Sequence, residues 1–268
     1  MRMVRFGELG DERPGVLLAS GELIDAGARF EDFDPEFFAD GGVSQLREWV
    51  RNGCRGGVEV CDQVRMAPPL QMSSSRVHVV NHCSVDDAGA QMEINSEEVT
   101  VYGARDPMLV DSASAVILDS VSVACVLGNP RPASHLTQMM RFVGCLAMGC
   151  FHVQYHGEEQ VCCGMGSQML TTDELGQHPL DDQIARYWSK LNNHVQTLGW
   201  YNEMSLCMNT LLEEVIARID CRPGDVVALT NLLCTEEACE AGGNAVRGDL
   251  IECGVEGLGV VKHRVVAA

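Results

Sequence analysis

The sequence predicts an α+β protein that is mainly β, in which a small N-terminal α+β domain precedes a larger β-rich domain. Short runs rich in Val, Ile and Leu dominate the chain after residue 76, whereas helical patterns are few. Residues 66–75 are rich in proline and serine, a composition typical of a linker. We therefore expect one domain over residues 1–70 and a second over residues 71–268.

Within the first domain, two short strands and two helices are expected. Residues 16–18 and 22–25 flank a Ser-Gly turn at residues 20–21, which predicts two strands joined by a tight turn. An Asp-Pro pair opens a helical pattern at residues 34–38, and a second short helix is predicted at residues 45–50.

The second domain is expected to be a sheet with a few covering helices. Its strand-like runs lie at residues 77–80, 115–118, 121–127, 224–230 and 257–266. Apolar residues recur near helical spacing at residues 135–148 and 204–219, which predicts two helices.

Composition excludes several classes of protein. The chain has 19 Lys and Arg against 38 Asp and Glu, a net charge of −19, which disfavours a protein that follows nucleic-acid phosphates. No apolar run approaches the ~18 residues of a membrane span, and the first residues lack the apolar stretch of a signal peptide. We therefore expect a cytoplasmic protein with neither nucleic acid nor membrane as a partner. The 13 Cys and 13 Met fit a reduced core, and the Met residues fit either core gaps or an adaptable pocket.

Four segments in order along the chain resemble motifs of the fumarylacetoacetate hydrolase superfamily. Residues 4–15 resemble its N-terminal domain, and residues 166–175 resemble "GPWLVTADEI". Residues 221–230 (CRPGDVVALT) are similar to its "PGDVILTGTP" strand, and residues 247–259 are similar to its "PGDVVEVEIEGLG" ending. The resemblance covers nearly the whole chain and implies that family's mixed β-sheet roll or sandwich.

The same resemblance implies that the metal ligands of the family are missing here. The family holds a divalent cation with two Glu of an ExE strand and one Asp, oxygen ligands that suit a hard cation. Those Glu positions fall on Ser120 and Ser122, or in a second register on Val121 and Val123, and the Asp position falls on Cys150. Without carboxylates, metal-dependent hydrolysis is disfavoured, and we expect neither a metal nor another cofactor.

Other catalytic positions of the family are replaced as well. By the same resemblance, its Arg becomes Gln154 and the following Asp becomes Tyr155, while its water-activating His becomes Val85 in a turn that contains His82. The "TGTPSG" turn is matched by residues 230–235, which begin Thr-Asn-Leu.

The residues by themselves suggest a nucleophile and base. If the segment is extended, Cys150 shares one face with His152 and His156, as a thiol and a proton acceptor would require. The alternative is a buried core cysteine beside ordinary histidines, and this alternative stays open.

Together, these observations predict a pocket that is more apolar than the metal site of the family. The predicted function is a metal-independent cyclase or isomerase, including a pericyclase, that acts on an apolar, polyketide-like natural-product intermediate. The alternatives are a non-catalytic pseudoenzyme that binds a small molecule, and a divergent C–C hydrolase or decarboxylase with rearranged ligands such as Asp119. The resemblance also implies a homodimer. The predicted catalytic residues are Cys150 and Gln154, and the predicted substrate-binding residues are His82, Val85, Ser120, Ser122, Cys150, Gln154, Tyr155, Met169, Asn231 and Leu232.

Overall fold

A computed structural model describes most of the chain. The described residues are 1–60, 63–73, 75–86, 89–95, 99–111, 115–129, 142–155, 158–175, 185–201, 212, 215–230 and 244–268. Within these ranges, no helical segment has the length and hydropathy of a membrane span.

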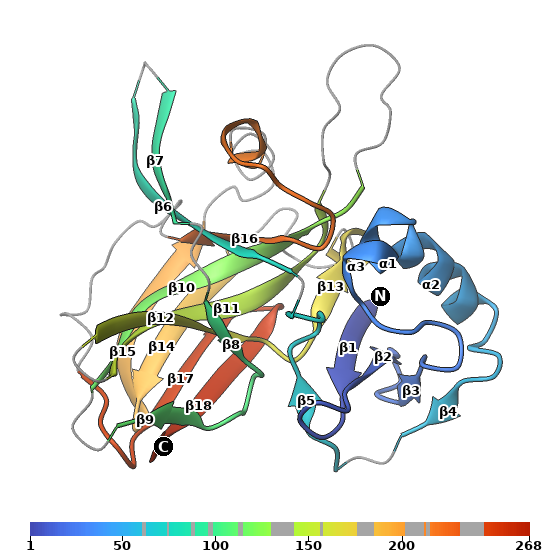
Figure 1. Cartoon of the computed structure of the whole chain (residues 1–268), viewed down its shortest axis with the longest axis horizontal. Helices are drawn as coiled ribbons and strands as arrows, with labels where there is room; N and C mark the ends of the chain where they lie inside the picture. Colours follow the sequence, from blue (N-terminus) through green and yellow to red (C-terminus); the bar gives the residue numbers. More distant parts are fainter. Residues whose placement is uncertain are drawn as a thin grey trace.

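The architecture is mainly β, with two mixed sheets that pack face to face (Figure 1). A 13-stranded sheet runs through the whole molecule, with the central order β4-β3-β2-β1-β13-β11-β10-β16-β6-β7, and a five-stranded sheet follows the order β15-β14-β17-β18-β9. One buried cluster joins the two sheets, since it includes Val121 and Phe151 of the first and Tyr187 and Val261 of the second.

The N-terminal part combines short strands with two helices. Its elements are β1 (Arg2–Phe6), β2 (Arg13–Leu17), β3 (Leu23–Asp25), α1 (Pro35–Ala39), α2 (Gly42–Arg51), β4 (Val58–Glu59) and β5 (Met66–Ala67). The carboxylate of Asp34 caps α1 by accepting a 2.8 Å hydrogen bond from the Phe37 amide, and proline at the first helical position favours this start.

The remaining elements form the two sheets of the β-rich part. The large sheet adds β6 (Val77–Asp86), β7 (Gly89–Asn95), β8 (Thr100–Tyr102), β10 (Val116–Leu127), β11 (Phe142–Tyr155), β12 (Glu158–Met165), β13 (Met169–Thr171) and β16 (Val226–Thr230). The small sheet consists of β9 (Met108–Val110), β14 (Ala185–Leu191), β15 (His194–Tyr201), β17 (Leu250–Val255) and β18 (Gly259–Ala267). A single turn of helix, α3 (Thr172–Leu175), follows β13.

The N-terminal part and the β-rich part share a sheet and a core. Strand β1 pairs with β13, and β13 pairs with β11, so the hydrogen-bonded ladder is continuous. A second buried cluster contains Phe33 and Leu46 from the N-terminal part together with Met148 and Ala228 from the β-rich part. A boundary near residue 70 stays a prediction.

Asp225 ties β16 to its parallel neighbour β6. Its buried carboxylate accepts hydrogen bonds from the Arg222 amide (2.8 Å) and from the Arg76 guanidinium (2.7 Å), and it lies 3.4 Å from His78 Nε2. Burial raises the pKa of Asp225, but the contacts with His78 and Arg76 outweigh it and hold this pKa at about 2. The ionised carboxylate therefore contributes to joining the two strands.

The mainly β fold and the strands expected from apolar runs are confirmed, with two corrections. The helix predicted at residues 135–148 is wrong where it is described, because residues 142–148 belong to β11. Both faces of β11 are buried, so its unbroken apolar run does not distinguish helix from strand. The runs at residues 115–118 and 121–127 are parts of one strand, β10. Of the helix predicted at residues 204–219, residues 212 and 215–218 are helical, residue 219 is a bend, and the rest lie outside the described residues.

Candidate functional site

A β-bulge in β10 decides which side chains face the candidate site. Leu118 pairs with Phe151 of β11, but Ser120 pairs with the adjacent Cys150, so Asp119 is an extra residue in the ladder. Alternation therefore changes face at Asp119.

Beyond the bulge, two serines lie on the face of Cys150. Val121 and Val123 join the core between the two sheets, so Ser120 and Ser122 point to the opposite face. This register agrees with the first of the two alignments drawn from the sequence.

Ser120, Ser122, Cys150 and Cys163 form a buried cluster that we call the polar pole. Ser122 is fully buried, Ser120 and Cys150 are nearly so, and Cys163 of β12 pairs with Cys150 across the strands. Within the described part of the chain, neither seryl hydroxyl has a hydrogen-bond partner. A buried hydroxyl without a hydrogen-bond partner costs about 1–3 kcal/mol, so a ligand that supplies an acceptor to these hydroxyls would regain that free energy.

The pole lowers the pKa of the Cys150 thiol. The Cys163 thiol, whose Sγ lies 3.9 Å from that of Cys150, lowers the pKa of Cys150 by hydrogen bonding to its anion. Burial opposes this shift, while the hydroxyls of Ser120 and Ser122 add to it. The two hydroxyls are thus close enough to stabilise negative charge at the pole.

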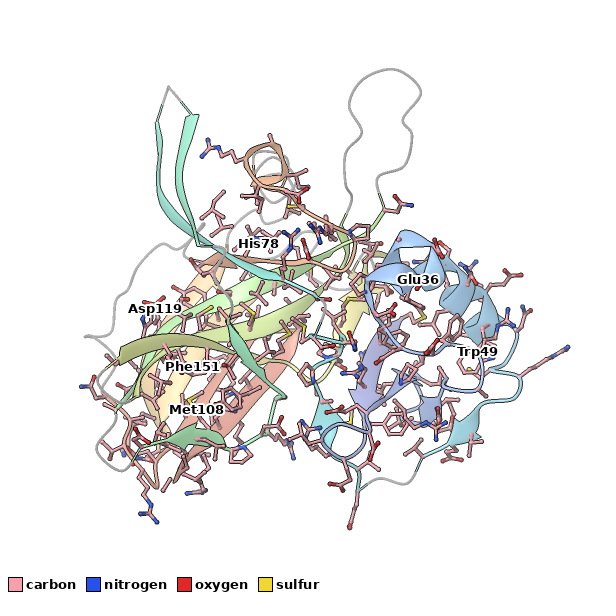
Figure 2. All side chains as sticks on the ribbon, viewed as in Figure 1. Glu36, Trp49, His78, Met108, Asp119 and Phe151 are labelled. Atoms are coloured by element: carbon pink, nitrogen blue, oxygen red, sulfur yellow. The ribbon has the colours of Figure 1, made fainter. Side chains whose placement is uncertain are left out.

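An imidazole and a carboxylate lie beside the pole. The strand β11 is extended, so His152 shares the face of Cys150 two residues away, about 7 Å along the strand. Nε2 of His152 lies 3.9 Å from Oδ1 of Asp119, and both side chains are partly exposed. Figure 2 shows Asp119 at one end of the large sheet, away from the N-terminal part. The arrangement offers a solvent-accessible proton carrier next to buried hydrogen-bond donors.

The other predicted site residues are described only in part. Met169 is fully buried on β13, in the same core cluster as Cys150. His82 and Val85 lie on β6, and Gln154 and Tyr155 lie at the end of β11, but their side chains are outside the described residues. Asn231, Leu232 and His156 lie wholly outside them.

The donor set does not fit a hard divalent cation. The three aligned positions supply two neutral hydroxyls and a thiol, and the neighbouring Asp119 supplies one carboxylate. In the described ranges, no three His, Cys, Asp or Glu side chains lie close enough to hold a metal ion. Magnesium and calcium ions need several charged or carbonyl oxygens, so we derive no chemical step through a metal.

Sequence reasoning missed two parts of this arrangement. Cys163 is not among the predicted site residues, although it lies directly opposite Cys150. The contact between Asp119 and His152 joins strands whose relative register depends on the bulge. The signal that could have indicated it is an acidic residue that interrupts an otherwise regular apolar alternation in β10.

Solved structures of known proteins share this fold. A fumarylacetoacetate hydrolase from Exiguobacterium antarcticum superposes with a TM-score of 0.67 at 18% identity, covering 100% of both chains. A maleylpyruvate hydrolase from Sphingobium sp. SYK-6, in complex with manganese (II) ion and pyruvate, gives 0.70 at 16%, again covering 100% of both. A 5-carboxymethyl-2-hydroxymuconate delta-isomerase from Mycobacterium smegmatis gives 0.62 at 17% with the same coverage.

These likenesses establish the fold of the chain. It is the fold of fumarylacetoacetate hydrolase-superfamily structures, both hydrolases and isomerases, as the motifs predicted. No protein-family model and no curated protein sequence matches the chain.

Proposed function

From this fold, we propose that the protein is a metal-independent isomerase or cyclase that acts on a small, largely apolar carbonyl compound. The observation that carries the proposal is a pair of buried hydroxyls, Ser120 and Ser122, which have no hydrogen-bond partner among the described residues and lie beside the Cys150 thiol. Three hydrogen-bond donors at one buried point suit an oxygen that gains negative charge during reaction.

The isomerase step uses the neighbouring imidazole. His152 Nε2 removes a proton from the carbon next to the substrate carbonyl, and the electron pair moves onto the carbonyl oxygen. The pole donates hydrogen bonds to that enolate oxygen. The imidazolium, stabilised by the Asp119 carboxylate, then returns the proton at another carbon of the conjugated system, so the double bond has moved.

A cyclase or pericyclase would use the same pole without the proton transfer. Hydrogen bonds to an enone oxygen polarise the conjugated system, and an apolar enclosure holds a flexible chain close to its reactive geometry. The buried methionines of this core, Met148, Met165 and Met169, are flexible side chains that suit an irregular apolar ligand. A polyketide-like intermediate is the substrate class that we propose on this ground.

The experiment is an assay of chelator-treated protein with conjugated enones and linear polyenones, followed by ultraviolet absorbance and product NMR. We expect turnover without added metal. Removing one donor from an oxyanion site typically costs ~100-fold in rate, so Ser122→Ala and Cys150→Ala should each lose about that much. Cys125→Ala removes a buried thiol from the other core cluster and should leave the rate unchanged.

The same assay separates the proposal from its alternatives. Turnover that requires Mn²⁺ and is abolished by Asp119→Asn would favour a divergent hydrolase or decarboxylase. Saturable binding without turnover in any variant would favour a pseudoenzyme. If His152→Gln no longer shifts the double bond but still forms the cyclic product, cyclisation does not require proton transfer by His152.

A homodimer belongs to the proposal, because the motif resemblance implies it.

A further inference from the structure

Within the described strands, two pairs of cysteines face each other, and none of the eight described cysteines is in a disulfide. Cys150 of β11 lies directly opposite Cys163 of β12, and Cys125 of β10 lies directly opposite Cys145 of β11. The Sγ atoms are 3.9 Å apart in the first pair and 3.6 Å apart in the second. All four side chains are buried, so each pair is a contact between two thiols inside the protein.

The backbone of both pairs already fits a disulfide. Residues directly opposite in an antiparallel ladder have Cα atoms about 4.5–5.5 Å apart, and a disulfide spans Cα separations of about 4.4–6.8 Å. For Cys150 and Cys163, the Sγ atoms have to approach from 3.9 Å to about 2.05 Å, which side-chain rotation can supply while the strands stay paired. Backbone geometry alone therefore does not decide which of the two pairs reacts.

The surroundings of the two pairs differ in polarity. Hydrogen bonding by Cys163 lowers the pKa of Cys150 against the effect of burial, and the hydroxyls of Ser120 and Ser122 add to this shift. Cys125 lies in the apolar core between the sheets, where the hydrogen bond with its partner and burial raise its pKa. Because oxidants react with the thiolate, Cys150 is the sulfur expected to be oxidised first.

The polar pole also lies next to residues that meet solvent. The side chains of Asp119 and His152 are 44% and 32% exposed, and Asp119 is adjacent to Ser120 in the chain. Hydrogen peroxide is only slightly larger than water, so a small local opening beside these residues should admit it. Cys125 and Cys145 lie farther along the same strands, away from this exposed end.

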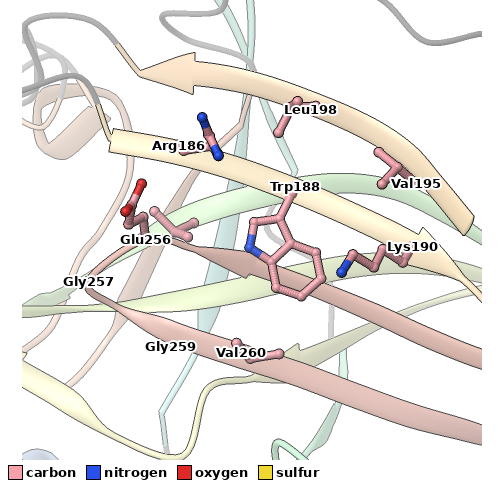
Figure 3. Close-up of a pocket in the computed structure, with 10 residues that line it drawn as sticks. Arg186, Trp188, Lys190, Val195, Leu198, Glu256, Gly257, Gly259 and Val260 are labelled. Atoms are coloured by element: carbon pink, nitrogen blue, oxygen red, sulfur yellow. The ribbon is translucent and has the colours of Figure 1, made fainter. Parts of the chain in front are cut away.

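The other described cysteines near Cys150 point the other way. Cys162 alternates with Cys163 along β12 and belongs to the core between the sheets. Cys253 of β17 packs from the same core against the glycine before Cys150. It thus points away from the groove of about 520 Å³ that Trp188 lines on the outer face of the small sheet (Figure 3). Among the described cysteines, Cys163 is therefore the one that can reach Cys150.

We propose that Cys150 and Cys163 are a site of oxidation by hydroperoxides, at which the two residues form a disulfide. The Cys150 sulfur attacks one oxygen of the hydroperoxide, and the O–O bond breaks. Cys150 becomes a sulfenic acid, and the second oxygen leaves with the proton of the Cys150 thiol, as water when the oxidant is hydrogen peroxide. The Cys163 sulfur then attacks the sulfenic sulfur, and the hydroxyl leaves with the Cys163 proton as water. The two cysteines lose two electrons, which the hydroperoxide gains.

The disulfide withdraws Cys150 from the polar pole. A disulfide sulfur has no proton to donate, and Cys150 moves toward β12, away from Ser120 and Ser122 on β10. One of the three donors proposed for the substrate oxygen is then lost, so oxidation should lower turnover ~100-fold until a dithiol reduces the disulfide. This consequence for turnover rests on the proposed function, whereas formation of the disulfide does not.

The test is mass spectrometry of native protein treated with hydrogen peroxide, alkylated without reduction and cleaved after Arg and Glu. These cuts separate Cys150 from Cys163 and Cys125 from Cys145, so each disulfide appears as a pair of linked peptides. We expect the link between Cys150 and Cys163 to form at least ~10-fold faster than the link between Cys125 and Cys145. Dithiothreitol should reverse it.

Matched alanine variants assign the partners. Cys163→Ala should leave Cys150 as a sulfenic acid that dimedone traps, and Cys150→Ala should prevent both the link and the trapped product. Cys162→Ala and Cys145→Ala remove nearby thiols that are not part of the site and should keep the link. Circular dichroism confirms that each variant is folded.

Three outcomes overturn the proposal: no link at Cys150, a link from Cys150 to a different cysteine, or equal rates for the two pairs. Full turnover by completely linked protein would show that oxidation does not control the site. Protein that forms the link but never turns over a substrate, even when reduced, would contradict the proposed function and leave the site of oxidation standing.

Discussion

Cys150 and Cys125 are buried cysteines with opposite surroundings. Each faces another cysteine across an antiparallel strand pair, with Sγ atoms 3.9 Å apart for Cys150 and Cys163 and 3.6 Å apart for Cys125 and Cys145. The hydrogen bond with Cys145 and burial raise the pKa of Cys125 well above its usual value, whereas Cys163 and the two serines lower that of Cys150. The polar pole is therefore what distinguishes Cys150 chemically.

This difference predicts selective alkylation. Because the thiolate is the nucleophile, native protein treated with iodoacetamide near neutral pH should be labelled at Cys150 several-fold faster than at Cys125 or Cys145. Peptide mass spectrometry over a time course measures the rates. Cys163→Ala should slow labelling of Cys150, because it removes the main group that stabilises the thiolate. Equal labelling of both pairs would show that the pole does not activate the thiol.

At the scale of single residues, the sequence predicts three members of the polar pole but not how the pole is arranged in space. Ser120, Ser122 and Cys150 follow from aligning motifs along the chain. The opposition of Cys150 to Cys163, and the proximity of Asp119 to His152, depend on the register between strands that are distant in sequence. Local residue patterns carry no such register.

Among the elements, the bulge in β10 is expected to affect activity but not the stability of the fold. Pairing is regular on either side of Asp119, and removing this residue would make Leu118 and Ser120 consecutive opposite Phe151 and Cys150. We predict that deletion of Asp119 keeps the free energy of unfolding within about 1 kcal/mol of wild type, measured by urea denaturation.

The same deletion should abolish the proposed proton transfer, because it removes the carboxylate beside His152. The matched variant Asp119→Asn keeps the bulge and should lose activity to a similar extent. A deletion variant that unfolds, or one that retains the activity, contradicts this reading of the bulge.

The junction of β6 with β16 predicts a dependence of stability on acid. The pKa of Asp225 is about 2 in the folded protein against 3.8 when unperturbed, so the unfolded chain binds a proton first as pH falls. The stabilisation by the ionised carboxylate is complete above pH 4 and is lost between about pH 4 and pH 2. Asp225→Asn should lower stability by about 2–3 kcal/mol at neutral pH, since a buried group that accepts charged hydrogen bonds is lost.

Thermal melts between pH 2 and pH 7 measure this effect. The variant should show a weaker fall in melting temperature below pH 4 than the wild type. Glu31→Gln, at an exposed position, serves as the control and should keep the wild-type profile. Parallel curves for Asp225→Asn and wild type would contradict the assignment.

Element prediction succeeded where the side chains themselves favour a strand. Runs rich in β-branched residues gave β6, β10, β16 and β18, and the Asp-Pro start gave α1. The run in β11 contains Gly, Ala, Met and Cys, which have little preference for strands, so only its partners on both sides make it extended.

For the whole molecule, the shared sheet and core predict one unfolding transition. Strand β1 completes the ladder next to β13, and N-terminal aromatic residues pack against the β-rich part. We expect the fluorescence of Trp49, followed in a Trp188→Phe and Trp200→Phe background, to change at the same urea concentration as the far-ultraviolet circular dichroism. Two separated midpoints would show that the N-terminal part folds independently.

The strand pair β10 and β11 also shows how proteins of this fold can lose their sequence motifs and still be recognised by structural comparison. The positions of residues 120, 122 and 150 are fixed by backbone hydrogen bonds, which do not depend on the side chains attached. Evolution can therefore exchange acids for hydroxyls and a thiol at one spot without rebuilding the scaffold. Such an exchange removes the residues by which a sequence motif is recognised, whereas the backbones can still be superposed. Superposition of backbones therefore detects the shared fold where comparison with family models finds no match.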